Sequence, residues 1–165
     1  MMDVQRFTTG PRRDAGRGGF SLIELLMAVS IIGIIAGLAI PNMRQMVFRA
    51  RATEVAADLE VVRVATVNYN GNVFQWPPEA GPGAIPPQLE GYLPEGFSFQ
   101  GNGYELDFEN WPLPGGLPGD PSTRQLIGIT VTAAEDQLSN AIAELLGGSI
   151  VFTVGNAHTV VIDRS

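Results

Sequence analysis

The stretch Gly19-Phe20-Ser21-Leu22-Ile23-Glu24-Leu25-Leu26-Met27-Ala28-Val29-Ser30 opens an apolar run of 21 residues, from Phe20 to Ile40, that contains one charge, Glu24. At about 1.5 Å per residue, a helix of this length covers about 30 Å, which is the thickness of the hydrocarbon core of a bilayer. The run therefore predicts a membrane-spanning helix over residues 20–40.

Glu24 is an unusual residue for such a segment. A carboxylate costs on the order of a few kcal/mol near the middle of a membrane and less towards its surface. Two interpretations stay open from this residue alone. Either Glu24 lies at headgroup depth in contact with water, or it pairs with a positive group.

Charge is distributed unevenly along the chain. Before Phe20, four arginines stand against two aspartates, a balance of +2, whereas the chain from Phe20 onward carries six arginines and fifteen acids, a balance of −9. Arginines just before a spanning segment tend to stay cytoplasmic, so the acidic remainder is expected across the membrane. An acidic body argues against nucleic-acid binding. The absence of cysteine excludes disulfides, zinc–thiolate sites and a catalytic thiol.

Residues 1–19 are rich in Gly and Arg, show no hydrophobic period and end in Gly18-Gly19, which indicates a leader peptide. A general secretory signal peptide is the competing interpretation, because Gly37-Leu38-Ala39 offers a small-x-small cleavage site. Its apolar region would be longer than the usual length of about 7 to 15 residues and would contain a charge.

After the span, Pro41 removes one backbone hydrogen bond and is expected to kink or loosen the helix without necessarily ending it. Beyond it, apolar residues recur at steps of four and three, the seam of an amphipathic helix. These residues are Phe48, Ala52, Val55, Leu59, Val62, Thr66 and Tyr69. We therefore expect one helix from Phe20 to about Asn70, with a membrane half over 20–40 and a water-facing half over 41–70.

The remainder, 71–165, is expected to form a globular α/β head. Loops rich in Pro and Gly are expected over Asn70–Pro94 and Trp111–Pro121. Alternating apolar residues and turn signals predict strands. The strand ranges are 96–100 and 104–110 around Gly101-Asn102-Gly103, then 126–132, and 150–154 and 157–162 around Gly155-Asn156. Thr132-Ala133-Ala134-Glu135 fits a capping box that would open a short helix ending at Gly147-Gly148. The expected fold is α+β, an antiparallel sheet packed on the long helix.

Taken together, these features resemble the type IV pilins and the pseudopilins of type II secretion systems, which share a class III prepilin-type cleavage and methylation motif. The match rests on Gly18-Gly19-Phe20-Ser21-Leu22-Ile23-Glu24-Leu25-Leu26 and extends through Ala39-Ile40-Pro41 to about Asn70, roughly a third of the chain. The remaining two thirds show only similarity of architecture.

The resemblance implies roles for four residues. A prepilin peptidase would cut between Gly19 and Phe20 and methylate the new amine of Phe20. Glu24 would pair with the N-terminal amine of an adjacent subunit, and such pairing offsets the burial of both charges. Pro41 lies where the helix of family filaments is partly unwound. The other interpretation is that Pro41 is a membrane-surface proline that lies beside glycines used in packing. The two interpretations are compatible.

Other chemistry is sparse. The chain has one histidine, His158, and shows no G-x-S-x-G, H-E-x-x-H or P-loop motif, so no catalytic residue is assigned. No cofactor is expected except calcium, which major pseudopilins bind through an acidic loop. Asp107, Glu109 and Asp120 are the weak candidates for its oxygen ligands. The alternative is that Asp107 and Glu109 simply form the solvated face of a strand.

The expected function is that of a non-enzymatic filament subunit. It would lie in the cytoplasmic membrane with its N-terminus inside and its head outside, then enter a periplasmic or cell-surface filament. Its implied partners are other pilins or pseudopilins, the prepilin peptidase and, indirectly, an assembly platform and ATPase. Alternatives are a membrane-anchored binding domain that never polymerises and an exported enzyme cut by signal peptidase. The sequence does not distinguish a pilus from a secretion pseudopilus or a DNA-uptake system.

Overall fold

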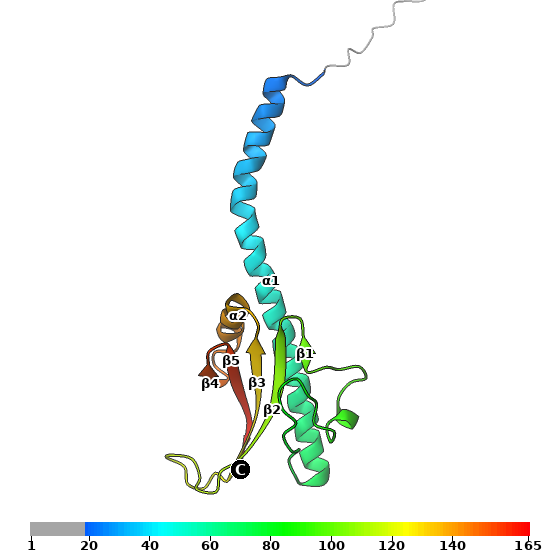
Figure 1. The fold of residues 1–165 in the computed structure, drawn as a ribbon, viewed down its shortest axis with the longest axis vertical. Helices are drawn as coiled ribbons and strands as arrows, with labels where there is room; N and C mark the ends of the chain where they lie inside the picture. Colours follow the sequence, from blue (N-terminus) through cyan, green and yellow to red (C-terminus); the bar gives the residue numbers. More distant parts are fainter. Residues whose placement is uncertain (1–18) are drawn as a thin grey trace, which may run out of the picture. The chain divides into compact units, whose positions relative to one another are not determined.

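The computed structural model describes residues 19–165, without the side chain of Pro41, so the expected leader lies outside the described residues except for Gly19. The chain divides into two compact units, the first ending at Ile40 and the second running from Pro41 to Ser165. The helix α1, Leu22–Val73, contributes residues to both and continues through Pro41 (Figure 1). It begins and ends within three residues of the expected limits.

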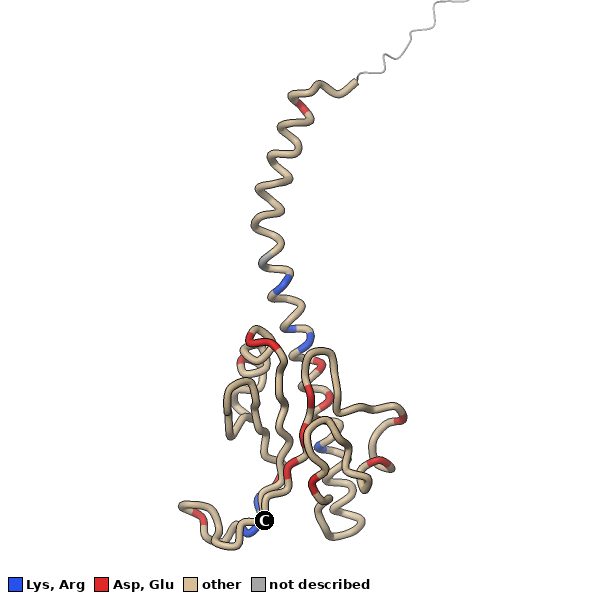
Figure 2. The backbone as a smooth tube through the Cα atoms, viewed as in Figure 1, with Lys and Arg blue, Asp and Glu red and all other residues tan. Residues whose placement is uncertain are grey.

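The described part of the first unit is an apolar helix preceded by three residues without regular structure, Gly19 to Ser21. By length and composition this part of α1 can cross a membrane, with an 18-residue window of mean hydropathy 2.5 that is not buried at all. Large apolar side chains here are all exposed, from 53% at Ile40 to 89% at Phe20. Glu24 is the only charged residue of this stretch (Figure 2).

The second unit is built on an antiparallel sheet. Its strands are β1 (Gln100–Gly101), β2 (Tyr104–Pro112), β3 (Gln125–Ala133), β4 (Ile150–Val154) and β5 (Ala157–Arg164). Their order in the sheet is β1-β2-β3-β5-β4, and each neighbouring pair is antiparallel. A short helix, α2 (Asp136–Leu146), connects β3 to β4. The predicted α+β class, with a long N-terminal helix and a short second one, is confirmed.

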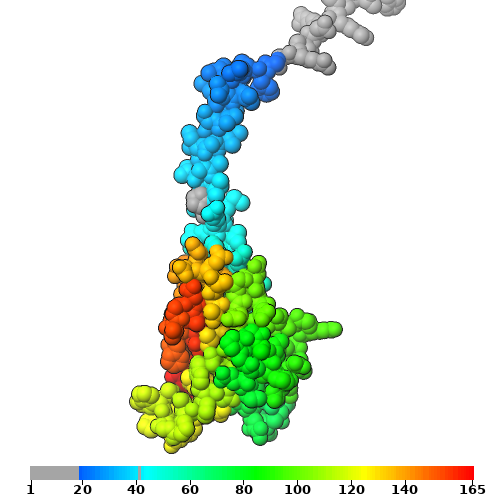
Figure 3. Space-filling view, viewed as in Figure 1, coloured from blue at the N-terminus to red at the C-terminus, as the bar shows by residue number. Residues whose placement is uncertain are grey.

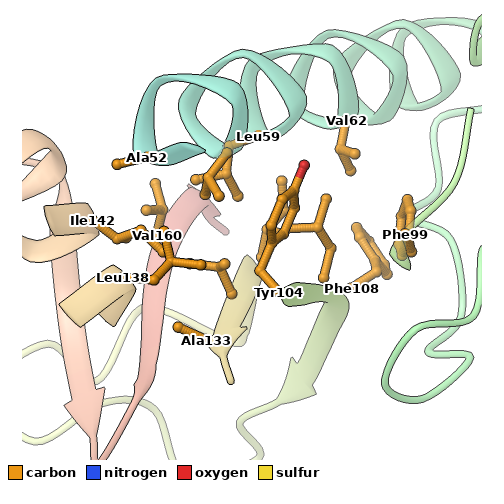
Figure 4. Close-up of a cluster of buried hydrophobic side chains, with 14 of the residues drawn as sticks. Ala52, Leu59, Val62, Phe99, Tyr104, Phe108, Ala133, Leu138, Ile142 and Val160 are labelled. Atoms are coloured by element: carbon orange, nitrogen blue, oxygen red, sulfur yellow. The ribbon is translucent and has the colours of Figure 1, made fainter. Parts of the chain in front are cut away.

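The core of this unit lies between α1 and one face of the sheet (Figure 4). The stripe predicted from the spacing on α1 is the buried one, because Ala52, Val55, Leu59 and Val62 are at most 5% exposed. The sheet and α2 supply the facing side chains, which are Leu106, Phe108, Ile127, Ile129, Val131, Leu138, Ile142 and Val160.

The strand expected over 96–100 is wrong in extent, because only Gln100 pairs with β2 before the turn. Gly96 adopts a positive φ of 77°, and the Phe97 amide donates to the carbonyl of Pro94, so a turn replaces the strand. The hairpin itself is present, with Gly101 paired to Tyr104. A Cβ on Gly101 would lie 2.1 Å from the Tyr104 ring, so this position requires glycine.

The capping box predicted at Thr132–Glu135 is also wrong. Thr132 and Ala133 still belong to β3 and pair with Glu105 and Tyr104 of β2. The helix α2 begins at Asp136, and its N-cap residue Glu135 makes no side-chain capping bond. Strand pairing at Thr132 therefore overrides the local capping pattern.

The segment 74–99 forms a layer beside the sheet (green in Figure 3) and includes one short 3₁₀ helix, η1 (Glu90–Tyr92). It lies along the edge of β2, where the Gly83 amide donates to the Leu106 carbonyl at 2.9 Å. At the other end, Asn110 Nδ2 donates to the Pro77 carbonyl at 2.6 Å. This edge of the sheet is thus occupied by the chain itself.

Candidate functional site

Glu24 lies in the first turn of α1, where Ser21 and Glu24 bond to each other reciprocally. The Glu24 amide donates to Ser21 Oγ at 3.2 Å, and the Ser21 amide and hydroxyl donate to Glu24 Oε2 at 3.2 and 3.3 Å. This is a capping box, and its sequence signal, Ser21-x-x-Glu24, is present but was missed. The carboxylate therefore has a local role besides any intersubunit one.

The predicted cleavage residues, Gly19 and Phe20, both lie outside the helix and are exposed. Phe20 is 89% exposed, and a side chain on Gly19 would contact nothing within 4 Å. Because these residues are exposed and precede α1, a protease cleft can reach them without unwinding the helix.

Pro41 is helical in its backbone, while its side chain lies outside the description. Gly33 and Gly37, on the preceding turns, leave open surface, since a Cβ on either would meet nothing within 4 Å. Small residues at this spacing permit close approach of another helix.

The three calcium candidates do not form one site. Asp107 and Glu109 lie on β2, on the sheet face away from the core, whereas Asp120 accepts hydrogen bonds from Ser122 and Thr123 within its own turn. These bonds lower the pKa of Asp120. Across residues 19–165, no group of three or more His, Cys, Asp or Glu side chains is placed to hold a metal ion.

Asp107 is the most perturbed acid of the head. Burial raises its pKa from 3.8 to about 6, and the charges of Glu109, Glu79 and Glu105 act in the same direction. Its Oδ1 atom is buried with no hydrogen-bond partner. An ionised Asp107 is therefore unfavourable in the folded head.

Asp107→Asn is expected to raise the melting temperature of the head at pH 8 and to change it little near pH 4. The folded carboxyl keeps its proton up to about pH 6, whereas the unfolded one loses it near pH 4. The native protein therefore loses the stability contributed by Asp107 as pH rises through this window, and the variant lacks this loss. Circular dichroism melting of the full chain in detergent micelles measures the difference.

Glu105→Gln is the matched control, because it removes a neighbouring charge but leaves Asp107 ionisable, so a smaller gain is expected. If Asp107 were a calcium ligand, Asp107→Asn would lower the melting temperature in the presence of calcium. If added calcium chloride raises the melting temperature and Asp107→Asn abolishes that rise, Asp107 holds the metal.

His158 is buried between α2 and the sheet. Its Nε2 lies 2.8 Å from Ser139 Oγ and its Nδ1 lies 3.2 Å from Thr153 Oγ1. Ser139 and His158 are only 4% and 3% exposed, so a substrate has no access to this pair. The contact attaches α2 to β4 and β5.

The N-terminal region of the chain is similar to known proteins. Residues 14–40 match the family described as "Prokaryotic N-terminal methylation motif". A type IV major pilin protein of Neisseria gonorrhoeae is 33% identical over 76 residues, 44% of this chain and 46% of that protein. A type IV major pilin protein of Myxococcus xanthus is 37% identical over 68 residues, 41% of this chain and 28% of that protein.

A fimbrial protein of Neisseria meningitidis serogroup B is 36% identical over 59 residues, 36% of this chain and 35% of that protein. The chain thus spans less than half the length of these relatives. No solved structure matches it. The resemblance to type IV pilins, with their N-terminal methylation motif, is confirmed.

Proposed function

We propose that this protein is a structural subunit of a type IV pilus, held in the cytoplasmic membrane by residues 20–40 and polymerised through the same segment. The observation that carries the proposal is the apolar surface of residues 20–40, where every large apolar side chain is exposed and Glu24 is the one carboxylate. Such a surface is stable only under lipid or against other helices of its kind. The relatives are called pilins and fimbrial proteins, which favours a pilus over a secretion pseudopilus.

In this proposal, a prepilin peptidase cuts between Gly19 and Phe20 on the cytoplasmic side and methylates Phe20. Exposure of the junction and its position within the matched motif support this step. Cleavage converts the amide of Phe20 into an ammonium group. Glu24 of a neighbouring subunit then supplies the carboxylate that pairs with it. Pairing inside the filament would neutralise both groups in an apolar environment.

The same proposal sets the topology and partners. Arginines of the leader keep the N-terminus cytoplasmic, and the acidic head lies outside before it enters the filament. Other pilins, the peptidase, an assembly platform and its ATPase are the partners, and the role is non-catalytic.

Mass spectrometry of the mature N-terminus tests the proposal. We expect a chain that begins with N-methylated Phe20. An intact leader would instead indicate a membrane-anchored domain that is never processed, and a chain beginning at Ile40 would indicate signal-peptidase cleavage and export. Electron microscopy of sheared surface material then tests polymerisation, because a processed subunit that forms no filament contradicts the structural role.

A further inference from the structure

The sheet face opposite the core carries a groove of about 660 Å³. Its floor and walls come from β2 (Glu109, Trp111), β3 (Thr130), β5 (Thr159) and β4 (Phe152, Val154), together with part of the 113–124 loop. This volume lies within the range of about 300 to 1,000 Å³ that is usual for small-ligand sites. No residue of the 20–40 segment, through which we propose assembly, lines this groove.

Two aromatic rings give the groove its shape. Trp111 and Phe152 form an edge-to-face pair with centroids 6.3 Å apart, although β2 and β4 are not neighbours in the sheet. Gly128 of β3 lies between them and has no side chain, and a Cβ there would lie 3.8 Å from the Trp111 ring. The indole therefore lies over Gly128 and contacts the Phe152 ring. The side chains of Phe152 and Val154 are 44% and 79% exposed.

One carboxylate is oriented within this apolar lining. Thr130 Oγ1 donates to Glu109 Oε1 at 2.8 Å, and Thr159 Oγ1 lies 2.9 Å from Thr130 Oγ1. Among the described residues, Glu109 Oε2 has no hydrogen-bond partner. The groove lining contains no Arg or His, so no cation within the groove neutralises Glu109. Burial raises the pKa of Glu109, and the hydrogen bond from Thr130 lowers it in part.

We propose that this groove binds a small organic cation with an apolar body, its charge against Glu109 and its body against Trp111 and Phe152. Aromatic faces and a carboxylate both attract a positive group, and the attraction grows as the site loses water. An apolar protein strand fits less well, because it would bury Glu109 without a partner. An anion is disfavoured by Glu105 and Asp107, which precede Glu109 on the same face of β2.

Titration calorimetry of the full chain in nonionic micelles tests this site with benzyltrimethylammonium chloride as the probe. We expect saturable binding that weakens about tenfold or more in Glu109→Gln. The matched control is Glu105→Gln, which removes a carboxylate from the same strand face outside the groove and should change affinity less than about twofold. Sodium benzenesulfonate, an anion with the same ring, should not bind.

Phe152→Leu gives an independent variant, since it keeps apolar volume on an exposed edge strand but removes one ring. It should weaken the probe severalfold while circular dichroism shows a native head. Equal binding of benzenesulfonate, an unchanged affinity in Glu109→Gln, or no binding of the cation to the native chain would each overturn the proposal. None of these results depends on whether the chain polymerises.

Discussion

Glu24→Gln is expected to leave the protein in the membrane and cleaved after Gly19, but to reduce filament assembly by more than about a hundredfold. In the proposed filament, the variant leaves the ammonium of a neighbouring Phe20 without a counter-charge among apolar side chains. Removing one partner of a buried ion pair costs about 3–5 kcal/mol, and each 1.4 kcal/mol is tenfold in an association constant. Sheared filaments measured against the membrane-bound pool by immunoblot give the ratio.

The capping bonds of Glu24 demand a control, because its carboxylate also closes the first turn of α1. Gln can still accept from the Ser21 amide and hydroxyl, whereas Ala removes the charge and the bonds to the Glu24 side chain and keeps only the bond from its amide to Ser21 Oγ. Ser21→Ala removes the side-chain cap and keeps the charge.

These variants separate the two roles of Glu24. If charge pairing governs assembly, Glu24→Gln and Glu24→Ala should be equally defective and Ser21→Ala close to the native chain. If Glu24→Gln assembles normally while Ser21→Ala does not, Glu24 acts through its own helix and the intersubunit pair is wrong. Mass spectrometry of each variant confirms that processing is not the step being lost.

Local patterns in the sequence predict most of the fold. The steps of four and three from Phe48 to Tyr69 identify the buried face of α1, because the period of a helix links neighbours in sequence to one face. The alternation in Tyr104–Asn110 identifies β2 in the same way. Where the prediction fails, at 96–100 and at Thr132–Glu135, pairing with a distant strand or a turn at Gly96 decides the outcome.

Some site residues can be predicted from the sequence alone, and others only from the fold. Gly19, Phe20 and Glu24 belong to one continuous motif, so roles can be proposed for them from residue order alone. The Ser21–Glu24 cap could have been predicted from the same stretch. The groove on the sheet face opposite the core could not be predicted from the sequence, because Trp111 and Phe152 come from strands that are not neighbours in the sheet. Their contact depends on the sheet order and on the gap at Gly128.

Phe108→Ala is expected to destabilise the head by about 3–5 kcal/mol, because it leaves a ring-sized cavity. Phe108 is fully buried on β2, opposite Ile129 and within the core that includes Val62 of α1 (Figure 4). A domain of this size is stable by only about 5–15 kcal/mol, so the loss is a large part of the total. Thermal melting followed by near-ultraviolet circular dichroism measures this loss of stability. Limited proteolysis at 37 °C is a second measure.

Phe74→Ala removes the same atoms at a position that is 86% exposed and should change stability by less than about 0.5 kcal/mol. Comparable losses in the two variants would contradict the core described for this head.

The comparison also separates folding from maturation. Since the methylation motif at residues 14–40 lies before the head, Phe108→Ala should still yield a chain beginning at Phe20, although its head is cleaved faster by protease than the native head. A processed N-terminus on an unfolded head would show that the peptidase reads the leader and the first turns of α1, and not the folded domain behind them.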